Sequence, residues 1–363
     1  MTKTTKQQKK QRSSVSRRSV IKGLAVGAGA AAFGFPNFVR AQKNGEVYVR
    51  TSGGSYQEAL RNGTWSAFED KTGIRVVPVP ANTSKMLAMV QAGEGGLDLI
   101  AGNEPATLTL QKAGALEKLD KSRFEITDLA DVAPVTDYYI GYSFFAEVLV
   151  YNKETFPDRH PGSWKDFWDV ETFPGPRSLQ DAKAIAPNLE FALLADGVSR
   201  ENLYPIDVDR AFRKLSEIKP HIVKFFDTGA LGASMIAEKT VVLTSLWANR
   251  AQVLMDKGAP LGIEWNEAMR MLEASAILKS AKNRDNAYRL LDFELSPEPQ
   301  ANTLPKVLLS PTNRKAFNYI DEKVAANLPT SPSNRKIGFD NSGAWWVDNR
   351  AAVLERWQEF LLG

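Results

Sequence analysis

Short apolar runs alternate with amphipathic stretches along the chain after residue 45. The first predicted strands and helices are, in chain order, residues 46–52, 56–72, 74–79, 83–92 and 97–101. A β-α-β-α-β order is typical of a parallel sheet covered by helices. Gly73, Gly93 and Gly114 each follow an amphipathic stretch, where a left-handed helix cap favours glycine. The pattern therefore predicts an α/β fold.

A second α/β segment starts near residues 142–145, where an apolar strand runs through residues 148–151 into Pro- and Trp-rich sequence. We interpret this strand as the first crossing between two lobes. The elements predicted after it are a helix at 208–218, buried strands at 241–246 and 274–278, and a closing helix at 346–362. The strand at 274–278 is expected to return to the first lobe.

The first 41 residues have the three parts of an export signal. A basic polar region precedes a 13-residue apolar run at 23–35, and Val39-Arg40-Ala41 is typical of a cleavage site. Arg17 and Arg18 stand in a context that resembles the twin-arginine signal. The alternative, a basic tail with a membrane helix, is disfavoured because a span needs about 20 apolar residues. We expect removal of residues 1–41 and a periplasmic protein.

Charge and composition argue against several classes of function. The 363-residue chain has a net charge of +4, but residues 1–42 hold nine Lys and Arg and no acid, which leaves a net charge of −5 on the rest. The main argument for nucleic-acid binding is thereby lost. Cysteine is absent, and the two histidines, His160 and His221, each stand beside a proline. No catalytic constellation, cofactor motif or metal-ligand spacing stands out.

Polar residues at predicted strand ends are the first candidates for ligand binding. Ser52, Gly53, Ser55 and Tyr56 follow the strand at 46–52 and open a helix, so their amide and hydroxyl groups could face a cleft. A plain turn with Ser55 as N-cap fits the spacing equally well. Asn103 and Glu104 follow the strand at 97–101, where either could instead cap the helix that Pro105 begins.

Trp, amide and charged residues supply the remaining candidates. Those that follow the strand at 241–246 are Trp247, Asn249 and Arg250; an indole can cover an alkyl chain or cation, and Arg suits a carboxylate. The others are Tyr142 at the first crossing, Trp265, Asn266 and Trp345. Each Trp has an alternative role as core or interface filler.

Several segments, in order, resemble the extracellular solute-binding proteins of the spermidine/putrescine-type ABC importers. They lie at residues 51–56, 68–74, 150–153, 173–177, 295–301, 310–313 and 345–349. The resemblance covers nearly the whole chain after the signal. It implies a type II-like periplasmic-binding fold, with hinge-connected lobes closing over a ligand cleft. The lobes expected are residues 44–144 with 272–315 and residues 145–271 with 316–363.

The resemblance also implies a small-molecule ligand, an ABC permease in the inner membrane as partner, and no enzyme activity. Tyr56, Trp247, Trp265 and Trp345 match positions where relatives flank a polyamine chain, with Glu104 or Glu264 as carboxylates. Arg250 departs from a polyamine site, since a guanidinium repels a dication. A polyamine-like ligand is therefore expected, with a carboxylate or zwitterion such as a γ-amino acid as the alternative.

Two rival functions remain, a ferric-ion receptor and an exported enzyme. Iron would require clustered tyrosines, but the neighbours Tyr138 and Tyr139 would point to opposite faces of a strand. An enzyme would require a nucleophile with its base, and none is apparent. We expect a monomer that binds neither nucleic acid nor a resident cofactor.

Overall fold

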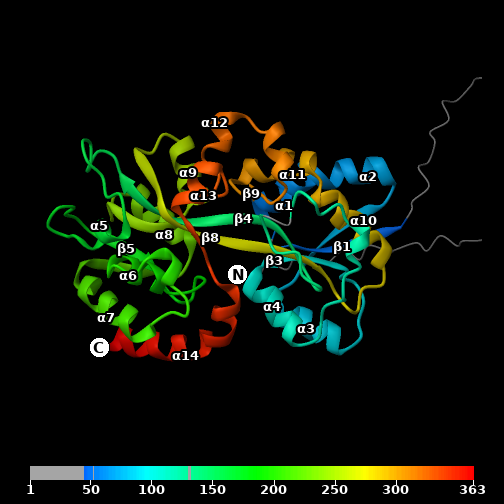
Figure 1. Cartoon of the computed structure of the whole chain (residues 1–363), viewed down its shortest axis with the longest axis horizontal. Helices are drawn as coiled ribbons and strands as arrows, with labels where there is room; N and C mark the ends of the chain where they lie inside the picture. Colours follow the sequence, from blue (N-terminus) through cyan, green and yellow to red (C-terminus); the bar gives the residue numbers. More distant parts are fainter. Residues whose placement is uncertain (1–44, 52, 130–131) are drawn as a thin grey trace, which may run out of the picture. The chain divides into compact units, whose positions relative to one another are not determined.

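The computed structural model describes residues 45–51, 53–129 and 132–363 (Figure 1). The predicted signal peptide and Ser52 lie outside these residues. Among the helices that the structure describes, none combines the length and the apolar character that a membrane crossing requires.

One mixed sheet runs through the described chain in the order β2-β1-β3-β8-β4-β7-β5-β6, with β10 beside β8 and β9 beside β4. Strands β1 to β3 are parallel to one another, as are β5 to β7. The long antiparallel pair β4 and β8 joins these two groups (Figure 1). The strands are β1 Glu46–Thr51, β2 Arg75–Pro80, β3 Leu99–Asn103, β4 Ile140–Asn152, β5 Arg177–Gln180, β6 Ile222–Phe226, β7 Leu243–Trp247, β8 Leu261–Ile277, β9 Ser310–Pro311 and β10 Phe339–Asp340.

Helices cover both groups of strands. In the first group a π-helical turn, Arg61–Trp65, joins α1 to α2 within the helix predicted at 56–72. The bounds of the helices are α1 Gly54–Leu60, α2 Ser66–Thr72, α3 Thr83–Gln91, α4 Glu104–Lys112, α5 Trp164–Trp168, α6 Leu189–Ala195, α7 Val208–Ile218, α8 Gly229–Ala237, α9 Ala248–Asp256, α10 Arg284–Leu295, α11 Pro297–Thr303, α12 Glu322–Ala325, α13 Pro332–Ile337 and α14 Gly343–Leu362. The predicted helix at 208–218 is confirmed as α7, and Gly73 has the positive φ expected of a helix cap.

Each group of strands has its own apolar core. Trp65 and Phe68 are buried against β1 and β3, whereas Trp164 and Phe191 stack at 3.7 Å beneath β5 to β7. Burial of one such side chain contributes about 2–3 kcal/mol to stability. We call the group of β1 to β3 lobe 1 and the group of β5 to β7 lobe 2.

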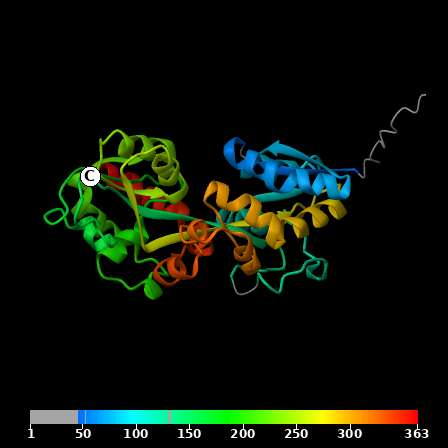
Figure 2. The ribbon, with the colours of Figure 1, turned by 90° about the horizontal axis from the view of Figure 1, so that it is seen from above.

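The lobes are joined by three passages of the chain, namely β4, β8 and the segment around β10 (Figure 2). Twelve of the thirteen residues of β4 are buried, and the exception is the half-buried Phe145. Because helices cover both faces of these strands, their sequence is apolar without a clear alternation. The structure confirms the predicted two-lobed α/β fold.

Candidate ligand site

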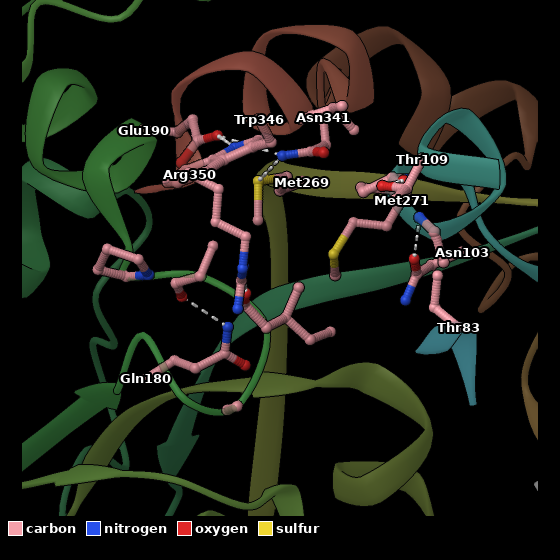
Figure 3. A pocket seen from close by; sticks show the side chains of 17 residues that line it. Thr83, Asn103, Thr109, Gln180, Glu190, Met269, Met271, Asn341, Trp346 and Arg350 are labelled. Atoms are coloured by element: carbon pink, nitrogen blue, oxygen red, sulfur yellow. Dashed lines mark hydrogen bonds between the residues drawn. The ribbon is translucent and has the colours of Figure 1, made fainter. Parts of the chain in front are cut away.

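A cavity of about 360 Å³ lies between the two lobes (Figure 3). Lobe 1, the crossing strand β8, and lobe 2 with the third passage all contribute side chains to it. The lining residues labelled in Figure 3 are Thr83, Asn103, Thr109, Met269, Met271, Gln180, Glu190, Asn341, Trp346 and Arg350.

Strand ends position the polar groups on the two walls. Asn103 ends β3 and caps α4, with its side chain accepting a hydrogen bond from the Ala106 N–H at 3.0 Å. Gln180 ends β5, and its Nε2 donates to the Ala186 carbonyl at 2.9 Å. The carboxyl ends of parallel strands are where open α/β sheets bind ligands. The cavity therefore occupies the expected edge of both parallel groups.

A second cavity of about 280 Å³ adjoins the first and shares Thr83, Asn103 and Ala106 with it. Arg50 lines this second cavity and donates to the carbonyls of Ala81 and Ala101, each at 3.0 Å. The carboxyl group of Glu273 also lines this second cavity and supplies a charge opposite to that of Arg50.

Glu273 is half-buried and accepts a hydrogen bond from the Ser143 hydroxyl at 3.1 Å. Burial raises the pKa of its carboxyl, while the bonds with Ser143 and Tyr56 and the charge of Arg50 oppose this rise. An acid in such surroundings interacts favourably with a ligand cation.

Glu190 is the most enclosed acid of the first cavity, with only 1% of its surface exposed. Its Oε1 accepts hydrogen bonds from Trp346 Nε1 at 2.7 Å and Asn341 Nδ2 at 3.2 Å (Figure 3). It also accepts one from the Tyr204 hydroxyl at 2.6 Å. Burial raises the pKa of the carboxyl, and the bonds from Tyr204, Trp346 and Asn341 limit the rise. The carboxyl thus ties α6, the third passage and α14 together at the cavity wall.

Arg350 projects from α14 into the same cavity (Figure 3). Its guanidinium donates to the Ile185 carbonyl and, at 3.3 Å, to the Ala182 carbonyl. Burial lowers its pKa, although an arginine remains charged at neutral pH. The first cavity therefore offers one cationic and one acidic group.

The lobes also touch beside the cavity, through α4 and α14. The Glu104 carboxyl accepts the Gly343 N–H at the start of α14 and the Tyr139 hydroxyl at 3.0 Å. A carboxylate at a helix N-terminus is favourable because of the helix dipole. Lys112 and Asp348 form an exposed ion pair between the same two helices.

Some sequence-predicted residues lie at the cavities. Asn103 caps α4, which confirms its alternative capping role, and it also lines both cavities. Glu104 lies beside them. Gly53 has a φ of 76° at the start of α1, where a non-glycine residue would be strained. The Tyr56 hydroxyl is buried without a hydrogen bond of ordinary geometry, close enough to Glu273 to affect its pKa. Ser52 and the side chain of Ser55 lie outside the described parts.

The predicted group Trp247, Asn249 and Arg250 stands at the end of β7, parallel to β5, but outside the lining of the cavities. The Trp247 ring and the Arg250 guanidinium lie over Gly229, where an added Cβ would come within 2.7 Å of the ring and 3.5 Å of Nε. Arg250 is exposed and pairs with no acid that the structure describes. Trp247 Nε1 and Asn249 Oδ1 are buried without a described partner.

Four predicted site residues have structural positions instead. Tyr142 is 1% exposed in the core of lobe 1, because β4 is covered on both faces. Trp265 packs against the core around β7 and α9, and Asn266 Nδ2 donates to the Gly162 carbonyl at 2.9 Å. Trp345 packs beside Tyr204, whereas its neighbour Trp346 lines the cavity.

Sequence reasoning missed several lining residues, among them Gln180, Glu190, Met269, Met271, Trp346 and Arg350. Gln180 carried a usable signal, since it ends a short strand as Asn103 does. Glu190 stands inside an apolar helix and is a single polar residue at a fully buried position. The family resemblance seen in the sequence did not point to Gln180 or to Glu190.

A cavity with polar strand ends on two walls, built between lobes that share crossing strands, defines a solute-binding protein. The chain belongs to the bacterial extracellular solute-binding protein family, which matches residues 64–330. A γ-aminobutyric acid-binding protein of Pseudomonas aeruginosa is 30% identical over 89% of this chain and 93% of its own. The spermidine/putrescine-binding periplasmic protein of Escherichia coli is 24% identical over 90% and 93%. The solved structure of a GABA receptor superposes with a TM-score of 0.78 at 30% identity, covering 87% of this chain and 97% of its own.

Proposed function

We propose that the protein is the exported receptor of an ABC importer and binds a small amine-bearing metabolite in the cavity between its lobes. The preferred ligand is an amine-carboxylate of the γ-aminobutyrate class rather than a pure polyamine. One observation carries this choice: the two adjoining cavities contain two guanidinium groups, Arg50 and Arg350, beside two acids, Glu190 and Glu273.

A polyamine carries only positive charge, so its site must supply an excess of acids to offset the cost of desolvating it. The balanced charge of these cavities suits a ligand that has one ammonium and one carboxylate. Similarity supports the same choice, since the γ-aminobutyric acid-binding relative is 30% identical and the polyamine-binding relative 24%.

Ligand bridging both walls would favour the closed arrangement of the lobes, which the membrane permease then recognises. No covalent bond is made or broken. Export by a twin-arginine signal, the periplasmic location, the monomeric state and the lobe boundaries stated above all belong to this proposal.

The test compares ligands that differ at one end. 4-Aminobutyrate and putrescine have the same spacing, with a carboxylate replacing one ammonium, and calorimetry with purified mature protein measures both. We expect tighter binding of 4-aminobutyrate. Tighter binding of putrescine or spermidine would reject the zwitterion, and no binding or thermal stabilisation by any amine would reject the amine receptor.

Variants then identify the carboxylate partner. Arg350→Gln removes the charge, and its shorter side chain also loses the hydrogen bonds to the Ala182 and Ile185 carbonyls. We expect at least a tenfold loss of 4-aminobutyrate affinity with putrescine binding unharmed. Arg250→Gln tests the exposed alternative, and Arg289→Gln, on the exposed face of α10, is the matched control.

A further inference from the structure

Glu147 lies on the crossing strand β4, in a row of side chains that spans the junction of the lobes. In the sheet it is directly opposite Met269 of β8 and Trp247 of β7. Directly opposed residues point to the same face of a sheet, and Met269 lines the cavity. Glu147 is therefore part of the floor beneath the ligand site, although none of its surface is exposed.

Asn188 connects this carboxyl to the lobe 2 wall of the cavity. Its Nδ2 donates to Glu147 Oε1 at 2.7 Å, and its Oδ1 accepts the Gln180 N–H at 2.8 Å and the Ser245 hydroxyl at 3.0 Å. Gln180 and Glu190, which line the cavity, are at the two ends of the segment that Asn188 anchors. The second carboxyl oxygen, Oε2, is buried without a described partner.

Of the described groups that affect the pKa of Glu147, one is the acid Glu190 and none is a cation. Burial raises the pKa of the carboxyl to about 7; bonds from Asn188 and Ser245 lower it, and the charge of Glu190 on α6 raises it. The facing side chains of β7 and β8, Trp247 and Met269, are uncharged. Glu147 and Glu190 are two buried carboxyls behind one wall of the cavity, and this arrangement favours the binding of a ligand cation.

We infer that Glu147 is a positioning residue of the ligand site: through Asn188 it holds the wall segment 180–190, and with Glu190 it supplies the negative charge that receives the ligand's ammonium group. The wall part of this inference rests on the geometry alone. The charge part rests on the proposed function, because it requires a ligand that carries an amine.

Proton release on binding follows from the charge part. In the free protein at pH 7 a substantial fraction of Glu147 is protonated, and an ammonium group nearby favours the ionised form. Affinity for an amine should therefore rise with pH from 6 to 8, by at most about tenfold per pH unit for one proton.

Hydrogen exchange of the ligand-free protein tests the wall part. Glu147→Leu removes the acceptor of Asn188, so the amides of residues 180–190 should exchange at least tenfold faster. Glu147→Gln keeps an acceptor and should restore protection. Glu294, equally buried in lobe 1 with a pKa also raised to about 7, is the matched control, and Glu294→Leu should leave residues 180–190 protected. Unchanged exchange in Glu147→Leu, or equal effects of both Leu variants, would overturn the positioning role.

Calorimetry with 4-aminobutyrate at pH 6, 7 and 8 tests the charge part. The unaltered protein and Glu294→Gln should bind more tightly as the pH rises, with proton release seen between buffers of different ionisation enthalpy. Glu147→Gln should show a flatter profile. A flat profile in the unaltered protein would reject the charge part. If 4-aminobutyrate does not bind although the exchange result holds, the proposed ligand class fails and the positioning role stands.

Discussion

Both lobes bury carboxyl groups, but the groups join different parts of the molecule. Glu294 of lobe 1 accepts a hydrogen bond from Trp65 Nε1 at 2.9 Å, which ties α10 to the π-helical turn inside one core. Glu190 of lobe 2 and Glu147 of the crossing strand β4 connect the cavity wall to the third passage, α14 and β4. Burial and a raised pKa are common to both regions. Connection to groups that line a cavity is what separates a ligand site from a structural acid.

The largest expected effect on stability comes from replacing Glu190, whose carboxyl accepts hydrogen bonds from several side chains. Glu190→Leu leaves Tyr204, Trp346 and Asn341 without their acceptor. We expect a loss of about 3–5 kcal/mol in the free energy of unfolding. Glu294→Leu leaves Trp65 alone unpaired and should cost about 1–3 kcal/mol. Urea unfolding at pH 5.5 measures both, and equal losses would contradict the distinction drawn between the lobes.

A smaller change in the stability of the folded protein should follow from a change in pH. The pKa values of Glu147 and Glu294 are each raised from 4.5 to about 7 in the folded protein. The folded state therefore holds more protons than the unfolded state in this window, so stability is lost as the pH rises from 4.5 to about 7. Each group accounts for at most about 3 kcal/mol. Melting temperatures at pH 5.5 and 8 should show the decline, and Glu294→Gln should reduce it. A melting temperature that rises over this range would reject the prediction.

The smallest effect is expected at the exposed contact between the lobes. Lys112→Ala removes the ion pair with Asp348, in which both side chains are more than half exposed. Such pairs contribute about 0–1 kcal/mol, and we expect a value near the lower end. Urea unfolding of Lys112→Ala beside Lys257→Ala, an exposed lysine with no ion pair among the described residues, provides the comparison. A loss above about 1 kcal/mol would show that this contact does more than a surface pair.

Strand-end reasoning singled out a residue that lines the cavity, because the ends of strands can be predicted from the sequence. Asn103 was found in this way, and Gln180 could have been. The resemblance pointed to Trp345, whereas its neighbour Trp346 lines the cavity; neighbouring residues on a helix point about 100° apart, and the sequence does not show which of the two faces the cavity. Tyr142 lies in the core of lobe 1 because β4 is buried on both faces, so alternation carries no direction.

Other parts of the fold depended on contacts distant in sequence. The strand predicted at 274–278 is only the end of the 17-residue β8, whose middle holds Trp265 and Asn266. Residues on either side pair with β4, Glu264 with Leu149 and Met269 with Glu147, so Trp265 and Asn266 lie at an irregularity within the strand. No local signal announces that long-range pairing.

The pairing of β3 with β8 also bears on how the chain is made. Residues 99–103 find their partners at residues 273–277, with the strands of lobe 2, β5 to β7, between them in sequence. While the chain grows, the inner edge of β3 stays open until residue 277 has left the ribosome, and open strand edges invite pairing with other chains. Part of lobe 2 can collapse meanwhile, whereas lobe 1 awaits both the last stretch of β8 and α10, whose Leu290 and Leu291 belong to its core. Synthesis rate and chaperone binding over that interval should therefore govern the yield of folded protein more than any single contact in lobe 1.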